Sequence, residues 1–294
     1  MKIKLVDVDS KIPNLALMKI SAWHKEQGDK VGFDIPDPDK VYASVILTKN
    51  AWKARALQFM FPGIPIDIGG SGIDLNKTLP QEIEGIKPDY DLYPSTYSQG
   101  YTTRGCIRKC GFCVVPRKEG QIKIWQHPEE FHDNRFNTCM IMDNNLFAAP
   151  QEWQDKVFSW FNENNIKMKS PQGWDARLLT LKRALKLYYL KHEGVIHFAW
   201  DNIEDEKYVF KAIETLKKVG FDLKHNISFY VLCGYNTTFE QDLYRCQKLR
   251  EAGVQAFAMR YRRSPELNAL ARWTIRPQLF WSVEFSEYTQ KVRA

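Results

Sequence analysis

Long apolar runs are missing from this sequence. No stretch approaches the roughly 18 to 20 apolar residues that span a membrane, and the opening residues, MKIKLVDVDS, have no apolar core like that of a secretory signal peptide. A G-x-G-x-x-G motif that opens a helix is also missing, so no dinucleotide site of that type is indicated. We expect a cytoplasmic protein that does not bind a membrane.

Cysteine is too scarce for a disulfide framework. The chain of 294 residues contains six cysteines, and three of them, Cys106, Cys110 and Cys113, lie within one short stretch, TTRGCIRKCGFCVVP. Domains held by disulfides are small and dense in cysteine, whereas a thiol cluster in a cytosolic chain is more typical of a metal site or a catalytic site. This spacing is therefore the leading functional signal in the sequence.

The composition is that of a folded protein with a local excess of positive charge. Apolar residues make up 44% of the chain and aromatic residues 13%, which excludes a disordered protein. Residues 104–118 carry five cations and no acid, and residues 259–276 carry five arginines and one acid, so the rest of the chain is close to neutral despite the net charge of +7. Local charge of this kind favours an anionic ligand or cofactor, although two solvated loops would look the same.

The first 75 residues alternate between strand-like and helix-like segments. Strands are predicted at IKLVDVD, KVGFDI, VYASVILT and IPIDIGGSG, and helices over residues 14–27 and 52–61. Strands that alternate with helices indicate a parallel sheet. We predict a small Rossmann-like or flavodoxin-like domain over residues 1–75 and a linker with at most a short helix over residues 76–96.

Polar and glycine residues follow the predicted strands of this first domain. Asp7, Asp9, Thr48 and residues 69–72 fall at carboxyl ends of strands, where parallel sheets bind ligands. Ordinary turns place aspartate and glycine at the same positions, and we favour that explanation over a ligand crevice.

A second region begins at residue 97. Strand-like runs start near residues 97, 139, 166, 195, 227 and 254, and amphipathic segments lie between them. The intervals between these starts match the length of βα units. We therefore predict a partial, six-unit TIM-like βα barrel over residues 97–265 and a C-terminal extension over 266–294. Thr238, followed three residues later by Gln241, has the capping-box pattern that begins a helix. The cysteines follow the first strand of this barrel, so they should lie at its mouth.

Three cysteines make an incomplete set of metal ligands. A structural zinc site is closed by four ligands, and C-x3-C-x2-C is unlike the paired C-x2-C motifs of zinc ribbons. An iron–sulfur cluster is the better match, because thiolates are its usual ligands. Three thiolates on a four-iron cluster leave one iron open to bind and activate another molecule.

The motif resembles that of the radical S-adenosylmethionine (radical SAM) superfamily over residues 97–262. It combines C-x3-C-x2-C with an aromatic residue, Phe112, before the last cysteine, after the first strand of the predicted barrel. The resemblance implies a [4Fe–4S] cluster on Cys106, Cys110 and Cys113, with SAM on the fourth iron. It also implies reductive cleavage of SAM to a 5′-deoxyadenosyl radical that abstracts hydrogen from a substrate, with flavodoxin or ferredoxin as the electron donor. The substrate stays unassigned.

The resemblance also assigns the remaining cofactor contacts. It implies SAM amino contacts after the second strand, ribose or carboxylate contacts after the third, and adenine contacts after the fifth and sixth. We expect Arg104, Arg108 and Lys109 to offset the negative charge of the cluster and of SAM. A thiol inside the barrel could exchange a hydrogen atom, and Cys233 is the candidate. The expected cofactor-binding residues are Phe112, Asp143, Asn144, Asn145, Gln172, Asp175, Arg177, Gly234, Met259, Arg260 and Tyr261.

The amino-terminal domain weakly resembles the cobalamin-binding domain that precedes many barrels of this superfamily. That domain carries its cobalt-ligating histidine in D-x-H-x-x-G, but here the stretch is DVDSKI, with Asp9 in place of the histidine. Gly69 and Gly70 match its later glycine pair. We expect a degenerate domain that does not bind cobalamin.

Two other functional hypotheses stay open. The basic segments could belong to a nucleic-acid-binding protein that zinc or an iron–sulfur cluster stabilises. Alternatively, the radical chemistry could act on a nucleotide or RNA, since Arg262, Arg263, Arg272 and Arg276 exceed what the cluster charge requires. Nucleic acid is not the favoured partner, because the sequence shows no known binding fold for it; a small molecule or a peptide fits at least as well.

Overall fold

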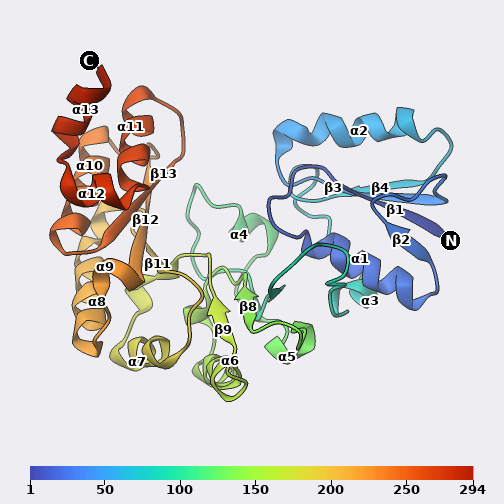
Figure 1. Ribbon diagram of the computed structural model, residues 1–294, viewed down its shortest axis with the longest axis horizontal. Helices are drawn as coiled ribbons and strands as arrows, with labels where there is room; N and C mark the ends of the chain where they lie inside the picture. The colour runs from blue at the N-terminus through green and yellow to red at the C-terminus, as the bar shows by residue number, and fades with distance from the viewer. Residues whose placement is uncertain (294) are drawn as a thin grey trace.

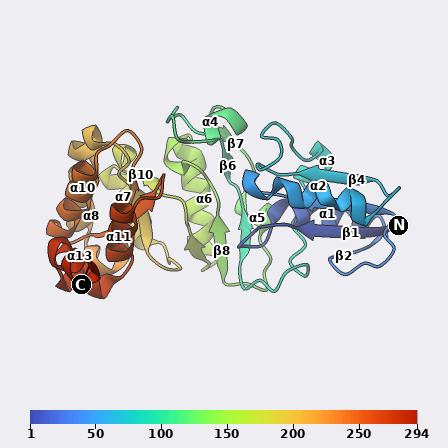
Figure 2. The same ribbon diagram turned by 90° about the horizontal axis from the view of Figure 1, so that it is seen from above.

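Paired parallel strands alternate with helices along most of this chain. The computed structural model describes residues 1–293, and all strand pairs in them are parallel except the short pair β6–β7. The chain forms two lobes, with helix α4 (Val115–Lys118) between them (Figures 1 and 2). The predicted α/β class with parallel sheets is confirmed. Among residues 1–293, no helix is both long and apolar enough to cross a membrane.

The amino-terminal lobe contains a four-stranded parallel sheet in the order β2-β1-β3-β4. Ile3 and Leu5 of β1 pack against Leu17 and Ile20 of α1, because alternate strand residues and one helical stripe are apolar. Asn14 caps α1 by accepting the Leu17 N–H at 3.2 Å. The elements are β1 (Lys2–Asp7), α1 (Leu15–Glu26), β2 (Lys30–Gly32), β3 (Lys40–Ser44), a 3-10 turn (Thr48–Asn50), α2 (Ala51–Met60) and β4 (Ile66–Gly69).

The residues at the carboxyl edge of this sheet form hydrogen bonds and close contacts with neighbouring parts of the chain. Asp9 accepts hydrogen bonds from the N–H groups of Ile46 and Leu47 at 2.7 and 2.9 Å and from Asn50 Nδ2 at 2.9 Å. A Cβ atom on Gly70 would lie 2.2 Å from the Val45 carbonyl oxygen, so only glycine fits there. These contacts support turn chemistry over a ligand crevice.

The segment over residues 76–96 packs closely against both neighbours. It holds one short helix, α3 (Gln81–Glu84), and Ile83 and Tyr90 are buried. The Tyr90 hydroxyl donates to the carbonyl of Phe131 at 2.7 Å. This segment therefore joins the lobes through buried contacts.

The second lobe carries its strands in chain order. The sheets β5-β8-β9 and β10-β11-β12-β13 are parallel, and each predicted strand run contains one strand that begins within one residue of the predicted start. The strands are β5 (Ser98–Gly100), β6 (Thr103–Arg104), β7 (Lys123–Ile124), β8 (Thr138–Ile141), β9 (Lys167–Lys169), β10 (Trp174–Asp175), β11 (Ile196–Ala199), β12 (Ile227–Cys233) and β13 (Gln255–Arg260).

Helices cover one side of the strands in this lobe. Figure 1 shows α8 and α10 on one side of β11–β13 and α4 on the other. The Thr238–Gln241 capping box at the start of α10 is present, as predicted. The helices are α5 (Pro128–Phe131), α6 (Gln151–Glu163), α7 (Leu181–Tyr189), α8 (Glu206–Val219), α9 (Leu223–Asn226), α10 (Phe239–Glu251), α11 (Pro265–Thr274), α12 (Pro277–Ser282) and α13 (Phe285–Arg293), with 3-10 turns at Leu146–Ala148, Ala176–Leu178 and Ile203–Asp205.

The short strand β10 and the break before it were not predicted. Pro171 lies between β9 and β10 and has no N–H to continue a ladder, so the sheet divides there. A single parallel bridge, Met168 to His192, still links β9 to the segment before β11.

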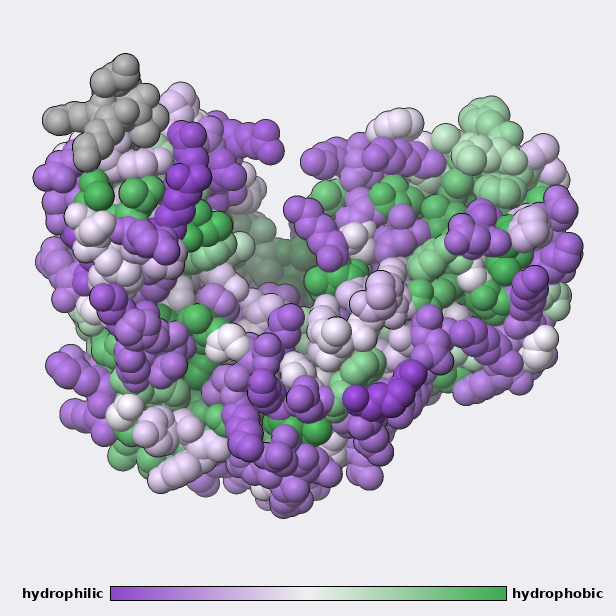
Figure 3. Space-filling model, in the orientation of Figure 1, coloured by the Kyte–Doolittle hydropathy of each residue, from purple (hydrophilic) through white to green (hydrophobic). Residues whose placement is uncertain are grey.

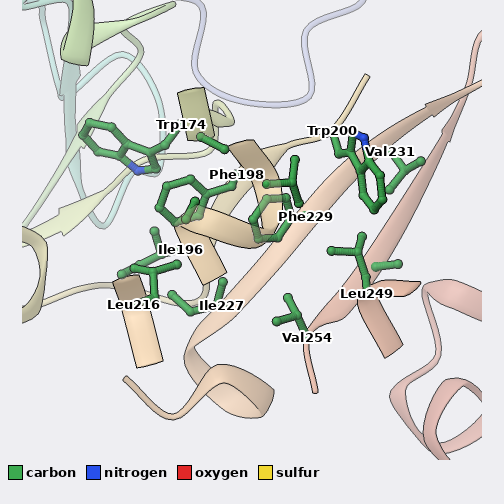
Figure 4. Close-up of a cluster of buried hydrophobic side chains, with 14 of the residues drawn as sticks. Trp174, Ile196, Phe198, Trp200, Leu216, Ile227, Phe229, Val231, Leu249 and Val254 are labelled. Carbon is green, nitrogen blue, oxygen red and sulfur yellow. The ribbon is translucent and has the colours of Figure 1, made fainter. Parts of the chain in front are cut away.

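The main core lies between β11–β13 and their covering helices. Ile196, Phe198 and Trp200 point to this side, as do Phe229 and Val231 of β12 (Figure 4). Strand alternation leaves the intervening residues on the opposite face. We call that opposite surface the inner face of β11–β13; it carries His197, Ala199, Tyr230, Leu232, Phe257 and Met259.

A buried ion pair fixes the carboxyl ends of β11 and β12. Arg245 and Asp242 of α10 lie 2.6 Å apart, and both side chains are fully buried. Arg245 also donates to the Trp200 carbonyl at 2.6 Å and to the Leu232 carbonyl at 2.7 Å, while Asp242 accepts the Gly234 N–H at 2.8 Å. The pair thus holds α10 to two strand ends at once.

Replacing Asp242 by alanine should destabilise the protein by about 3 to 5 kcal/mol, because it leaves the Arg245 charge buried and uncompensated. Urea unfolding of the wild type and of Asp242→Ala measures this loss. Glu251→Ala is the control, since it removes the exposed partner of Lys248 on the same helix and should leave the unfolding curve nearly unchanged. Equal unfolding midpoints for the two variants would contradict the structural role of the pair.

Candidate functional site

The three clustered cysteines lie in a loop whose ends are joined. Strands β6 and β7 pair antiparallel at its base, and the Cys106 N–H donates to the Gly120 carbonyl at 3.1 Å. We call residues 105–120 the cysteine loop. Gly105 has φ +81°, and a Cβ atom there would lie 2.2 Å from the Gln121 carbonyl oxygen. Glycine is therefore required where the loop begins.

The thiols of the loop differ from the other cysteines in exposure. Cys106, Cys110 and Cys113 are partly exposed and free of disulfides, whereas the remaining three cysteines are buried. Burial raises the pKa of the Cys110 thiol, and the positive charge of Arg177 opposes that rise. In residues 1–293, no three Cys, His, Asp or Glu side chains come close enough together to hold a metal ion. The thiols are thus available but do not converge.

Two N–H groups contact the sulfur of Cys106. Its sulfur accepts the Arg108 N–H at 3.3 Å and a longer contact from Asn145 Nδ2 at 3.7 Å. N–H donors of this kind stabilise the charged form of sulfur and tune a bound cluster. The Asn145 Oδ1 atom is buried and has no partner within residues 1–293. Thiolates are the usual ligands of iron–sulfur clusters, so the donor set is of the kind that such a cluster uses, although the three thiols do not converge in this structure.

The carboxylate of Glu119 holds the two ends of the cysteine loop together through hydrogen bonds. Its Oε2 accepts the Gly105 N–H at 2.9 Å and Asn144 Nδ2 at 2.8 Å, and its Oε1 accepts Arg104 Nη2 at 3.0 Å. One carboxylate thus joins both ends of the loop to the residues that follow β8. Sequence reasoning missed Glu119, because nothing in the sequence links it to residues 105 or 144.

Asp143 contacts the two threonines that precede the cysteine loop. Its carboxylate accepts the Thr102 N–H at 2.6 Å and the Thr103 hydroxyl at 2.7 Å. Burial raises the pKa of Asp143 to about 6, although these hydrogen bonds lower it. Of the three residues predicted to contact the SAM amino group, Asp143 is thus engaged with the chain, while Asn144 and Asn145 reach the cysteine loop.

The residues predicted after the third strand form a charge network with the cysteine loop. Asp175 Oδ2 accepts Arg108 Nε at 3.0 Å and Asn145 Nδ2 at 3.2 Å, and Asp175 Oδ1 accepts Arg177 Nε at 2.7 Å. Burial acts to raise the pKa of Asp175, but the hydrogen bonds and charges of Arg177 and Arg108 hold it below its usual value. Gln172 lies nearby, in a small pocket that residues 143–145 also line.

Aromatic residues form the other side of the site. Phe112 contacts Tyr235 edge-on with ring centroids 5.4 Å apart, and Tyr235 contacts Tyr261 in the same way at 4.8 Å. A pocket of about 570 Å³ opens here, lined by Gly234 and Tyr235 on one side and by Tyr261 on the other. The structure thus brings Phe112, Gly234 and Tyr261 together, and the expected contacts of Gly234 and Tyr261 with adenine stay a prediction. Sequence reasoning missed Tyr235.

Met259 and Arg260 lie at the edge of this group. The side chain of Met259 is 46% exposed, and the Arg260 guanidinium is bound to the Asn268 side chain. Within residues 1–293, neither residue makes a hydrogen bond, an ion pair or a ring contact with the cysteine loop. Their expected contacts with adenine stay a prediction.

The prediction that Cys233 faces the barrel interior is wrong. Its thiol is fully buried on the helix side of β12, beside Cys246 of α10. The hydrogen bond with Cys246 and burial both raise the pKa of Cys233. The alternation that places Phe229 and Val231 in the core also places Cys233 there, so this thiol has no access to a substrate.

The cysteine loop also contacts the amino-terminal lobe. Lys118 of α4 donates to the Ser71 hydroxyl at 2.6 Å, and Arg104, just before the loop, has its Nη1 3.4 Å from Glu84 Oε1 of α3. In the orientation of Figure 3, a hollow opens between the two lobes at the position of α4. The loop therefore lies in the floor of an interlobe hollow.

No known family model matches this chain, and no curated protein matches it significantly. The case for its function therefore depends on the contacts of its own residues. Those contacts place the cysteine loop beside the amide side chains after β8 and the aromatic residues after β12 and β13.

The raised pKa of Asp143 predicts a pH dependence of stability. Because the folded protein favours the protonated carboxyl, its stability should fall as the pH rises from about 4 to about 6, by up to about 3 kcal/mol, since each pKa unit is worth about 1.4 kcal/mol. Urea unfolding across this range should show the stability of the wild type falling by this amount relative to that of Asp143→Asn. Parallel pH profiles for the two proteins would show that Asp143 is not the group responsible.

Proposed function

We propose that this chain is a radical SAM enzyme whose cysteine loop holds a [4Fe–4S] cluster through Cys106, Cys110 and Cys113. The observation that carries the proposal is the position of the loop. Three free thiols lie in a loop with joined ends that follows β5 and β6, and the six predicted βα units supply the two parallel sheets β5-β8-β9 and β10-β11-β12-β13, each in chain order. We infer that these six βα units form a partial TIM-like barrel with the loop at its mouth.

A bound cluster would supply the electron that cleaves SAM to a 5′-deoxyadenosyl radical, which abstracts hydrogen from the substrate. The chain's own residues bind and orient. The N–H of Arg108 and the amide of Asn145 stabilise the sulfur of Cys106, and the unpartnered Asn145 Oδ1 can accept a hydrogen bond from an amino group. Phe112, Tyr235 and Tyr261 provide flat apolar surfaces for adenine.

The remaining parts of the proposal follow from the same site. We infer a cytoplasmic enzyme that receives its electron from a carrier such as flavodoxin or ferredoxin. The amino-terminal lobe is proposed to bind no cobalamin, because Asp9, which stands where a cobalt-ligating histidine would be, already accepts three hydrogen bonds from residues 46–50. A carboxylate held in this way is a poor ligand for cobalt.

A nucleotide or RNA substrate is the second candidate. Arg262 and Arg263 are exposed beside Tyr261, which is 56% exposed. Exposed arginines next to an aromatic ring can bind phosphate and stack a base. Weakened binding of an oligonucleotide by Arg262→Ala and Arg263→Ala would favour this candidate over a neutral substrate, and unchanged binding would reject it.

Cys110→Ala should abolish both cluster assembly and SAM cleavage. After anaerobic reconstitution with iron and sulfide, the wild type should show broad visible absorption and form 5′-deoxyadenosine from SAM with a strong reductant. Cys246→Ala is the matched control, because it removes a thiol buried on α10 and should retain both properties. Failure of the wild type to form 5′-deoxyadenosine, or equal activity of the two variants, would refute the proposed function.

Glu119→Gln should weaken retention of the cluster by about 10- to 100-fold, because groups that orient metal ligands contribute on this scale. The variant keeps the side-chain volume but loses the charge that binds Arg104. The rate of iron loss to a chelator measures the effect, and Glu129→Gln, at a largely exposed glutamate, is the control. Equal rates of iron loss in the two variants would mean that Glu119 does not position the cysteine loop.

A further inference from the structure

The inner face of β11–β13 carries no charged side chain over most of its length. The sequences IHFA, ISFYVLC and QAFAM contain no lysine, arginine, aspartate or glutamate. Three ring-bearing residues, His197, Tyr230 and Phe257, occupy this face and are only partly buried. Figure 1 places the face on the side of the cysteine loop, away from the helices that cover the core. A partly exposed apolar face beside a candidate catalytic loop is a common setting for a ligand.

The rings of this face are packed into one continuous surface. His197 lies nearly parallel to Tyr230, with ring centroids 4.5 Å apart and an interplanar angle of 14°. Tyr230 contacts Phe257 edge-on at 5.5 Å, and its hydroxyl donates to the Pro171 carbonyl at 2.9 Å. Tyr230 is thus held from three sides. Because the rings of His197 and Tyr230 face each other, they cover each other's faces, and the apolar surface that the three rings form is fixed in place.

His197 retains hydrogen-bonding capacity at both ring nitrogens. Its Nδ1 is buried without a partner, and its Nε2, which is not buried, has no hydrogen-bond partner in residues 1–293 either. Burial lowers the pKa of His197, which favours the neutral form of the ring. Because nothing in the described chain fixes its tautomer, Nε2 can either donate or accept a hydrogen bond.

The neighbours of His197 in the same row share this feature. Strand pairing places Ser228 beside His197 and Gln255 beside Ser228, and the Ser228 hydroxyl and Gln255 Oε1 are also buried without partners. Buried polar atoms are almost always hydrogen-bonded in folded proteins. The row formed by His197, Ser228 and Gln255 thus holds three buried polar atoms without partners, which indicates a role for them other than packing.

We propose that the inner face of β11–β13 binds an uncharged ligand that carries an amide or a similar group, with its apolar part against Tyr230 and Phe257 and the polar group on His197 Nε2. A charged group would lose its hydration here without meeting an opposite charge, so ions are excluded. We take this ligand to be the substrate of the enzyme, which rests on the proposed radical SAM function. The binding of the ligand to this face does not depend on that function.

The test uses the full chain without metal or SAM, so its result is independent of the Cys110→Ala experiment. Ligand-observed NMR should detect binding of benzamide and of uracil, and binding of benzoate and benzamidine should be at least tenfold weaker. His197→Phe keeps a ring beside Tyr230 but removes both nitrogens, and it should weaken benzamide binding at least fivefold. His225→Phe, at an exposed histidine of α9, should bind benzamide like the wild type.

Chemical modification gives a second measurement. Diethyl pyrocarbonate should modify His197 at Nε2, and benzamide should slow this reaction, while His225 in the same sample should react at an unchanged rate. If His197→Phe does not fold, Ser228→Ala replaces it as the variant of the binding site. Ser228→Ala should also weaken benzamide binding. Absence of binding by both benzamide and uracil overturns the proposal. So does equal binding of the charged probes, or undiminished benzamide binding in both His197→Phe and Ser228→Ala.

Discussion

The candidate site depends on one carboxylate, that of Glu119. It accepts hydrogen bonds from Gly105 at the start of the cysteine loop, from Arg104 before it and from Asn144 after β8. A loop of this length would otherwise be free to adopt many conformations, and its ordering costs conformational entropy. By joining the ends of the loop to the adjacent strand, Glu119 reduces the freedom of all three thiols at once.

The charges around the loop are more balanced than the sequence suggested. Residues 104–118 hold five cations and no acid, and we expected three of them, Arg104, Arg108 and Lys109, to offset the charge of a cluster and of SAM. In the folded chain, Arg104 pairs with Glu119, and Arg108 shares Asp175 with Arg177. Acids from outside the segment thus neutralise part of it. The arginines therefore act mainly by fixing geometry, and the net positive potential at the thiols is smaller than the segment's own charge implies.

The sequence predicts the strands well because strand patterns are local. Every predicted run of the second region contains a strand, and the Thr238–Gln241 capping box is present. The contacts of the site depend instead on residues far apart in the sequence. Nothing local connects Glu119 to Asn144 or Tyr235 to Gly111, whose Cβ atom would meet the tyrosine hydroxyl at 2.4 Å. The expected position of Cys233 inside the barrel was wrong for a related reason. Alternation along β12 groups Cys233 with Phe229 and Val231, but only long-range packing decides that this group faces the helices.

The amino-terminal lobe can contribute to the site without a ligand of its own. Asp9 is bound to the turn over residues 46–50, and the Tyr93 hydroxyl donates to Asp7 at 2.6 Å, so the carboxyl edge of its sheet is occupied by the chain itself. From this edge, Ser71 accepts a hydrogen bond from Lys118 of the cysteine loop. A lobe that is closed in this way is rigid, and a rigid neighbour limits the movement of α4. Its main physical effect is therefore to hold the far side of the loop, opposite the contacts of Glu119.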